Sequence, residues 1–205
     1  QTNFPLTENP MVDDGHWVGP DSYWTPMETG SGKCYGTAAA VNYEDSVAIR
    51  DNGSDTANYI EATLYELGGY TPGGTHEAQF GHGRYPAANQ TQMYEHLFPK
   101  GGLYQFVRWN GPIPVVTEDF TFDLPVTNYN GGPGGWTNQT VFRSEYLIVA
   151  GDPRIRLYQD GQLRMECTDS TAGKITTARG ALMAFWRTGA TPSSYCWDAV
   201  TVGNS

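Results

Sequence analysis

The amino-acid sequence predicts an all-β fold, a sandwich of two antiparallel β-sheets with little helix. Residues 152–168 alternate between apolar and polar side chains, which is the pattern of two half-buried strands. The chain is rich in turn formers and aromatic residues, with 25 glycines, 13 prolines and 13% aromatic residues, while only 17% of its residues are charged. Finally, about ten to thirteen short strand-like segments are separated by turn signals without a fixed repeat, and a two-sheet jelly roll is the natural way to arrange that many strands.

Residues 152–168, DPRIRLYQDGQLRMECT, are the clearest element, a predicted β-hairpin. Asp160-Gly161 lies between its strands and suits the two positive φ angles of a type I′ turn. One face of the hairpin is apolar and must be covered by a second layer. The opposite, polar face carries Arg156, Tyr158, Arg164 and Glu166.

The other elements are predicted in chain order. Residues 1–33 form an irregular lead-in with one or two edge strands, anchored by the large rings of Trp17 and Trp24. Residues 59–67 allow a helix, but their β-branched residues and the flanking glycine and proline favour a strand. Residues 86–97 are predicted as a loop with one helical turn, and the glycine-rich residues 128–135 as a loop that is a candidate ligand rim. The remaining predicted strands are two short ones within 35–50 and single ones at 76–84, 103–110, 118–126, 142–150, 181–187 and 195–202.

Length and charge limit the classes of protein that fit. A chain of 205 residues suits one domain, residues 1–205, and contains no linker-like segment. The net charge of −10 disfavours nonspecific binding to nucleic acid. The chain has no run of about 18 apolar residues, so we expect no insertion into a membrane. Its first residue, Gln1, fits a trimmed secretory signal and fits an artificial start equally well, and the composition favours secretion.

The three cysteines, Cys34, Cys167 and Cys196, leave two states open. Either one disulfide forms and one thiol remains, or all three are buried thiols that pack as small hydrophobic groups. The sequence has no Cys-x-x-Cys pair, so a structural zinc site is not expected. His76-Glu77 and His82 also lack the His-Glu-x-x-His spacing of a zinc protease.

Five groups of residues spread over most of the chain carry a family resemblance: FPLTENP with GHWV (4–10 and 15–18), YEDSVAI (43–49), VRWNGP (107–112), GDPRIRLYQDGQL (151–163) and YCWDAVTV (195–202). Together they resemble a concanavalin A-like lectin/glucanase domain of a poorly characterised kind found in secreted bacterial and bacteriophage proteins. The resemblance implies two curved antiparallel sheets. Relatives of this kind include lectins, carbohydrate-binding modules, glucanases, polysaccharide lyases and virion surface proteins, so the fold alone does not select the function.

The catalytic patterns of such domains are absent or incomplete in the sequence. Jelly-roll glucanases use Glu-x-Asp on one strand so that both carboxylates share a face, and this chain has no such pair. Glu44-Asp45 and Glu118-Asp119 are adjacent and would point to opposite faces of a strand. Arg143-Ser144-Glu145 resembles the Arg-Ser-Glu strand of alginate lyases, but the Gln-x-His and Tyr-x-Lys-x-Gly strands of those enzymes are missing. We therefore name no catalytic residue and interpret the triplet as an Arg/Glu pair on an exposed strand face.

No pattern in the sequence requires a cofactor, and calcium is the one ion that it suggests. Residues 51–55 are rich in oxygen ligands but lack the glycine and the glutamate of an EF-hand loop, which favours a turn. By resemblance, Asp198 is a candidate ligand for a structural calcium ion between the closing strand and the N-terminal segment. A single aspartate can as readily cap a bulge or accept hydrogen bonds from backbone amides.

Aromatic and arginine side chains supply a candidate ligand surface. Sugars stack on aromatic rings and are held by planar polar side chains. Tyr104, Arg108 and Asn110 share one face of a strand that we expect to be central. If that face coincides with the polar face of the hairpin, the two form a platform for an acidic or neutral glycan. Packing in the core is the alternative for these aromatic residues.

These observations favour a non-catalytic, lectin-like protein that recognises carbohydrate outside the cell or on a particle surface. One alternative is an architectural protein, such as a virion decoration or a subunit of an extracellular assembly, that binds other protein subunits. The other is a polysaccharide lyase or hydrolase with an unrecognised site. An exposed aromatic groove would support the first function, an interface well above ~1,000 Å² the second, and ionisable groups that converge in a cleft the third.

Overall fold

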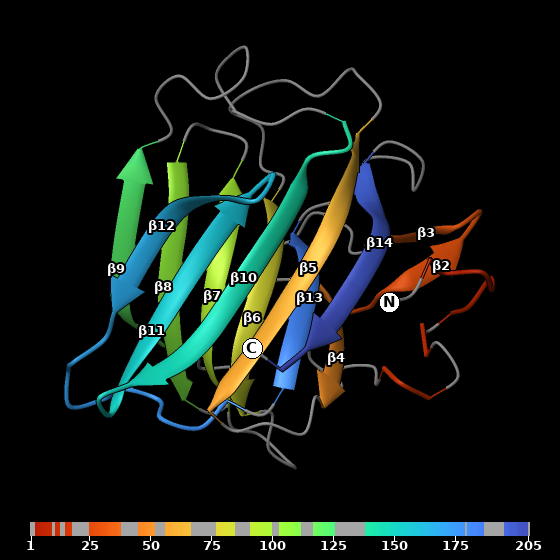
Figure 1. Cartoon of the computed structure of the whole chain (residues 1–205). Coiled ribbons are helices and arrows are strands. Elements are labelled where there is room, and N and C mark those ends of the chain that lie inside the picture. The colour runs from red at the N-terminus through yellow and green to blue at the C-terminus, as the bar shows by residue number, and fades with distance from the viewer. Residues whose placement is uncertain are drawn as a thin grey trace.

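The chain forms two β-sheets that pack face to face (Figure 1). The computed structural model describes residues 3–9, 11–12, 15–17, 25–37, 45–51, 56–66, 77–84, 91–99, 103–111, 117–125, 138–178, 180–186 and 195–204. Within these ranges all regular structure is β-strand and there is no helix. The predicted all-β sandwich of antiparallel sheets is therefore confirmed. One short pair departs from it, because β1 runs parallel to β4 at the edge of its sheet.

The first sheet, here called the hairpin sheet, lies at the front of Figure 1 and has the strand order β12-β11-β10-β5-β14-β3-β2. The second, here called the meander sheet, has the order β1-β4-β13-β6-β7-β8-β9. The strands are β1 (Thr25–Pro26), β2 (Glu28–Gly30), β3 (Lys33–Tyr35), β4 (Asp45–Asp51), β5 (Ala57–Glu66), β6 (Glu77–Arg84), β7 (Thr91–Pro99), β8 (Leu103–Gly111), β9 (Thr117–Pro125), β10 (Val141–Val149), β11 (Asp152–Gln159), β12 (Gln162–Thr168), β13 (Gly180–Trp186) and β14 (Tyr195–Gly203).

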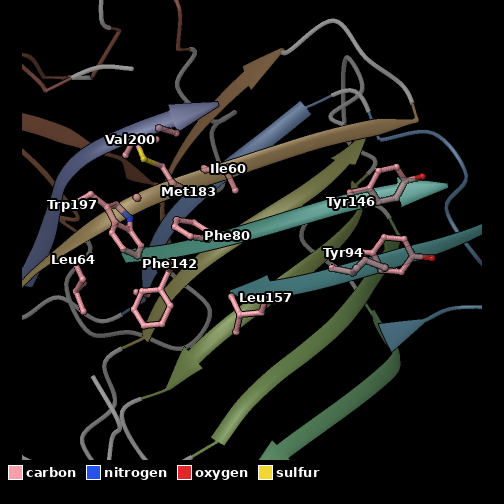
Figure 2. Close-up of a cluster of buried hydrophobic side chains, with 14 of the residues drawn as sticks. Ile60, Leu64, Phe80, Tyr94, Phe142, Tyr146, Leu157, Met183, Trp197 and Val200 are labelled. Carbon is pink, nitrogen blue, oxygen red and sulfur yellow. The ribbon is translucent and has the colours of Figure 1, made fainter. Parts of the chain in front are cut away.

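The core lies between the two sheets and is built from alternate residues of their inner faces. Phe80 of the meander sheet stacks on Trp197 of the hairpin sheet, with ring centroids 4.8 Å apart. Phe142 and Leu157 project into the same layer from β10 and β11 (Figure 2). Each fully buried side chain of this kind stabilises the fold by about 1.5–3 kcal/mol through the loss of contact with water.

The hairpin of β11 and β12 has the predicted turn. Asp160 and Gly161 have φ angles of 50° and 74°, as a type I′ turn requires. Burial alternates strictly along β11, so that Ile155 and Leu157 face the core. The side chain of Asp160 also accepts a hydrogen bond from the amide of Val141 at 3.0 Å, which ties the turn to β10.

Two predictions about elements in the meander sheet were wrong. Residues 91–99 form strand β7, although a loop with a helical turn was expected. Residues on both faces of β7 are buried, among them Tyr94 inside and Met93 outside, so the strand lacks the apolar–polar alternation that reveals a half-buried strand. Strand β8 is next to the edge strand β9 and is not central. The strand favoured over a helix at 59–67 is confirmed as β5.

The N-terminal lead-in is irregular and is held to the edge of the hairpin sheet. Trp17 is buried, as predicted, while Trp24 and the loop 128–135 lie outside the described residues. The amide of Met11 donates to the carbonyl of Met27 at 2.8 Å. All three cysteines lie in the described part of the chain, are buried and form no disulfide, so the second of the two predicted states is the one observed.

Candidate functional site

The predicted ligand residues of β8 point into the sandwich. Tyr104 is fully buried, and its hydroxyl donates to the side chain of Gln159 on β11. Arg108 is 4% exposed and pairs with the carboxylate of Asp169. Asn110 is partly exposed, and its side-chain oxygen accepts a hydrogen bond from Gln92 at 3.3 Å.

The predicted ligand residues of the hairpin lie on the outer face of the hairpin sheet, which is turned away from the core and therefore from the side chains of β8. Arg156 and Tyr158 are partly exposed on β11, as is Arg164 on β12, while Glu166 of β12 is exposed. The two predicted sets therefore do not form one platform, because the hairpin sheet itself lies between them. Binding of a ligand by the hairpin residues stays a prediction.

The outer face of the hairpin sheet instead carries a connected row of aromatic and charged side chains, here called the polar ladder. It crosses four neighbouring strands, β5, β10, β11 and β12, which are adjacent in the order of the sheet. Alternate residues of each strand face outward, and the polar ladder consists of such outward-facing residues. Its members are Tyr59, Arg143, Glu145, Tyr158, Arg156 and Glu166.

Arg143 forms the first half of the ladder. Its guanidinium lies over the ring of Tyr59, 3.8 Å from the centroid. Its Nη2 and Nε approach Oε1 of Glu145 at 2.7 and 2.9 Å. The other oxygen of Glu145 accepts the hydroxyl hydrogen of Tyr158 at 3.1 Å. Arg143 is thus held by a ring and a carboxylate at once, which fixes its planar group.

Arg156 and Tyr158 form the second half. Nε of Arg156 donates to Oε2 of Glu166 at 2.6 Å, and this hydrogen bond raises the pKa of Arg156. Partial burial, followed by the negative charge of Glu145, raises the pKa of Tyr158. Tyr158 therefore keeps its proton at neutral pH and remains a hydrogen-bond donor. The ladder presents two partly exposed tyrosines, with donors and acceptors in fixed positions between them.

The meander sheet carries a second candidate on its own outer face, made by Glu95 of β7 and Trp109 of β8. Nε1 of Trp109 donates to Oε2 of Glu95 at 2.6 Å. Trp109 is partly exposed, whereas Glu95 is 4% exposed. Glu95 stands in register with Gly81 on one side and Val107 on the other. An indole ring beside a carboxylate suits a hydroxylated, apolar-faced ligand.

The sequence reasoning did not find this pair. Glu95 lies in the segment that was expected to be a loop, and Trp109 lies on the face of β8 opposite to the one that was selected. The alternation of side chains along β8 could have revealed Trp109. Successive residues of a strand point to opposite faces, so Trp109 faces outward because Arg108 faces inward.

Residues with catalytic potential also meet between the sheets, where Ser144 of β10 contacts two histidines. Nδ1 of His96 lies 2.7 Å from the hydroxyl oxygen of Ser144, and Nε2 of His82 lies at the same distance. Nδ1 of His82 contacts the side-chain oxygen of Asn58, whose amide group donates to the carbonyl of Ala178. All of these side chains are buried, which keeps substrate away from the serine. The cluster is therefore structural.

The hydrogen-bond directions in this cluster follow from the chemistry of the partners. The oxygen of Asn58 can only accept, so Nδ1 of His82 carries the hydrogen and its Nε2 accepts from Ser144. Ser144 then accepts from His96. Both imidazoles are neutral in this arrangement. Burial lowers the pKa of His82 to about 3, and burial together with the nearby His82 lowers that of His96.

The Arg143-Ser144-Glu145 triplet lies on β10 and Asp198 lies on β14. Arg143 and Glu145 pair on the outer face while Ser144 points inward, which agrees with the interpretation of an Arg/Glu pair. Asp198 is the extra residue at a bulge of β14 and accepts a hydrogen bond from Gln139 at 3.3 Å. Among the described residues, no group of three His, Cys, Asp or Glu side chains is placed to hold a metal ion.

Comparison with known proteins identifies the fold. No protein-family model and no curated protein sequence matches the chain. A legume lectin-like domain from Entamoeba histolytica has a similar structure, with a TM-score of 0.56 and 11% sequence identity over 98% of this chain and 97% of that chain. A β-glucanase from Bacillus licheniformis also has a similar structure, with a TM-score of 0.54 and 14% sequence identity over 98% of each chain.

A third similar structure is the CBM2 module of the evolved Dit of Lactobacillus casei BL23 phage J-1, with a TM-score of 0.55 and 11% identity over 96% of this chain and 93% of that chain. In the parts of the chain that the structure describes, no helix has the length and apolar character needed to cross a membrane. At these identities the likeness concerns the fold. The chain has the concanavalin A-like jelly-roll fold that the sequence motifs implied.

Proposed function

We propose that this protein is a non-catalytic carbohydrate-recognition protein that binds a glycan on the outer face of its hairpin sheet. The polar ladder is the observation that carries the proposal. Two tyrosine rings can stack on the apolar faces of sugar rings, and the guanidinium and carboxylate groups between them can bind the hydroxyl groups. Because these groups already hold one another in place, little side-chain entropy is lost on binding.

The fold likeness supports the same function. Two of the similar structures are named a legume lectin-like domain and a CBM2 module. We further propose that the protein belongs to the secreted bacterial and bacteriophage kind of this fold, and acts outside the cell or on a particle surface. Detection of the protein in the culture medium or in purified particles tests that location. Its recovery in neither fraction would contradict it.

The ladder is tested by Tyr158→Ala, with binding measured on a glycan array and then by titration calorimetry with the best glycan. Tyr158→Ala removes one stacking ring and the donor to Glu145, and we expect a loss of affinity of about tenfold or more, since burying an apolar side chain of this size contributes about 1.5–3 kcal/mol. Tyr65→Ala is the matched control. Tyr65 is another partly exposed tyrosine on the outer side of β5, beneath Lys33 and outside the ladder. Equal affinities of the two variants would contradict the proposal.

The Trp109–Glu95 pair is the second candidate surface for the same function. Trp109→Ala removes its ring and leaves the ladder intact, because the two surfaces lie on different sheets. A loss of glycan binding in Trp109→Ala together with normal binding in Tyr158→Ala would move the site to the meander sheet. Release of reducing ends or unsaturated uronates from the bound glycan would instead show that the protein is a hydrolase or a lyase.

A further inference from the structure

Three sulfur atoms meet at the edge of the hairpin sheet, at a place that the proposed function does not use. They belong to Met11, Met27 and Cys34 and are here called the sulfur cluster. The thiol of Cys34 donates toward the sulfur of Met11 at 3.2 Å and toward that of Met27 at 4.0 Å. The exposed fractions of the three residues are 1%, 1% and 0%. The cluster is therefore closed to bulk water.

The cluster joins three separate segments of the chain. Met11 lies in the N-terminal lead-in, Met27 lies between β1 and β2, and Cys34 lies on β3, next to the edge strand β2 of the hairpin sheet (Figure 1). The backbone hydrogen bond from Met11 to Met27 brings two of the sulfur-bearing residues together. On the other side, Cys34 stands in register with Trp197 of β14.

We propose that the sulfur cluster is a binding site for one Cu(I) ion. Thiolate and thioether sulfurs are soft ligands and select Cu(I), whereas Ca²⁺ and Mg²⁺ require oxygen ligands. A metal–thiolate bond of about 2.3 Å places the three sulfurs of a trigonal site about 4 Å apart. The separation of Cys34 and Met27 already has this value, and that of Cys34 and Met11 must widen by less than 1 Å.

Charge also favours a monovalent ion. On binding, a Cu–thiolate bond replaces the S–H bond of Cys34 and the two thioether sulfurs coordinate the same ion, while one proton is released to solvent and no electron is transferred. The product contains Cu⁺, one thiolate and two neutral thioethers, and its net charge is zero. A divalent ion in the same place would leave one positive charge in an apolar surrounding, which is costly.

Entry of the ion requires only local opening of the lead-in. The backbone hydrogen bonds between this segment and the residues around β2 join Glu8 with Thr29, in both directions, and Met11 with Met27. A segment that lies outside the regular strands, at the edge of a sheet, opens more often than a central strand. Once bound, the ion cross-links residue 11 to residue 34 and stabilises the closed form.

The proposal is tested by anaerobic titration of the full chain with Cu(I) in competition with bicinchoninate. Wild-type protein should take up one equivalent, with thiolate-to-copper charge-transfer absorption and a raised melting temperature. Cys34→Ala should lose this binding. Met11→Leu and Met27→Leu should each weaken it at least about tenfold, because even groups that only orient a metal ligand contribute about 10- to 100-fold.

Two further variants and one spectrum keep the test decisive. Met165 and Cys167 are a second buried Met/Cys pair, on β12, so Met165→Leu and Cys167→Ala should bind Cu(I) like the wild type. Leucine conserves the volume of methionine, so the melting temperature without metal checks that the variants fold. X-ray absorption should show sulfur ligands alone. Undiminished binding by Cys34→Ala, no binding by the wild type, or nitrogen and oxygen ligands would overturn the proposal.

Discussion

Arg108 is a buried cation whose charge is balanced within the fold by Asp169. Their side chains are 5% and 0% exposed, whereas those of the ladder pair Arg156 and Glu166 are 28% and 38% exposed. Although burial opposes its ionisation, hydrogen bonds from Thr171, Tyr94 and Arg108 hold the pKa of Asp169 below its ordinary value. The pair is a structural element of the interior.

Removal of Arg108 should therefore destabilise the protein. Arg108→Ala leaves the carboxylate of Asp169 buried without its cation, and we expect a loss of about 3–5 kcal/mol in the free energy of unfolding. Arg156→Ala removes one member of an exposed pair and should cost no more than about 1 kcal/mol. Urea unfolding of both variants measures the difference. Similar losses for the two would show that Arg108 is not held as described.

The two buried histidines should make the fold sensitive to acid. The pKa of His82 is about 3 in the folded protein, and that of an unfolded histidine is about 6.5. As the pH falls below 6.5, the unfolded chain binds protons that the folded chain rejects, so the free energy of unfolding decreases by up to about 1.4 kcal/mol per pH unit for each histidine. The stabilisation is fully present above pH 6.5.

Urea unfolding at several pH values checks this prediction. The double variant His82→Gln, His96→Gln keeps all carboxylates. Any acid-induced decrease in the free energy of unfolding that it shares with the wild type is therefore due to the carboxylates. Only the difference between the two proteins reports on the histidines. Parallel pH profiles of wild type and double variant would refute the histidine contribution.

The hairpin shows which elements a sequence determines by itself. Its Asp-Gly turn and the alternation along β11 act locally, and both were predicted at the correct residues. On β12 the alternation is broken at Leu163, an apolar residue that is 50% exposed because the register shifts where β12 pairs with Leu157 and Tyr158. Strand β7 shows the opposite case. It is covered on both faces, so that no apolar stripe distinguishes it, and it becomes a strand because β6 and β8 supply hydrogen-bonding partners on either side. Such a strand depends on neighbours that are remote from any short sequence window.

The turn of the hairpin gives a prediction for this element. Gly161 has φ of 74°, and no atom beyond its chain neighbours lies within 4 Å of the position of an added Cβ. Gly161→Ala should therefore cost about 1–2 kcal/mol from the backbone alone. Gly161→Asn should cost less, because asparagine tolerates this conformation. Thermal unfolding of both variants tests the order, and a more stable alanine variant would contradict it.

At the scale of the whole molecule, the candidate site depended on which face of each strand looks inward. Alternation correctly put Tyr104 and Arg108 on one face of β8, and Arg156 and Tyr158 on one face of β11. A charged arginine on the inner face is unusual, since buried arginines require a partner. That partner, Asp169, follows β12 and is 61 residues away along the chain. The sequence does not show that these two residues meet, and the expected platform failed for this reason.

The path of the chain through the two sheets leads to the last prediction, that residues 1–205 unfold as one domain. β4 belongs to the meander sheet, β5 to the hairpin sheet and β6 to the meander sheet again, and later in the chain the sheet changes between β9 and β10, between β12 and β13 and between β13 and β14. Each sheet thus contains strands from both ends of the sequence, and Asn58, His82 and Ser144 join the two across the core. If one sheet unfolded, the other would lose the side chains that pack and hydrogen-bond against it across the core. We expect tryptophan fluorescence and far-ultraviolet circular dichroism to follow a single, coincident urea transition. Two separated transitions would divide the chain into independent units.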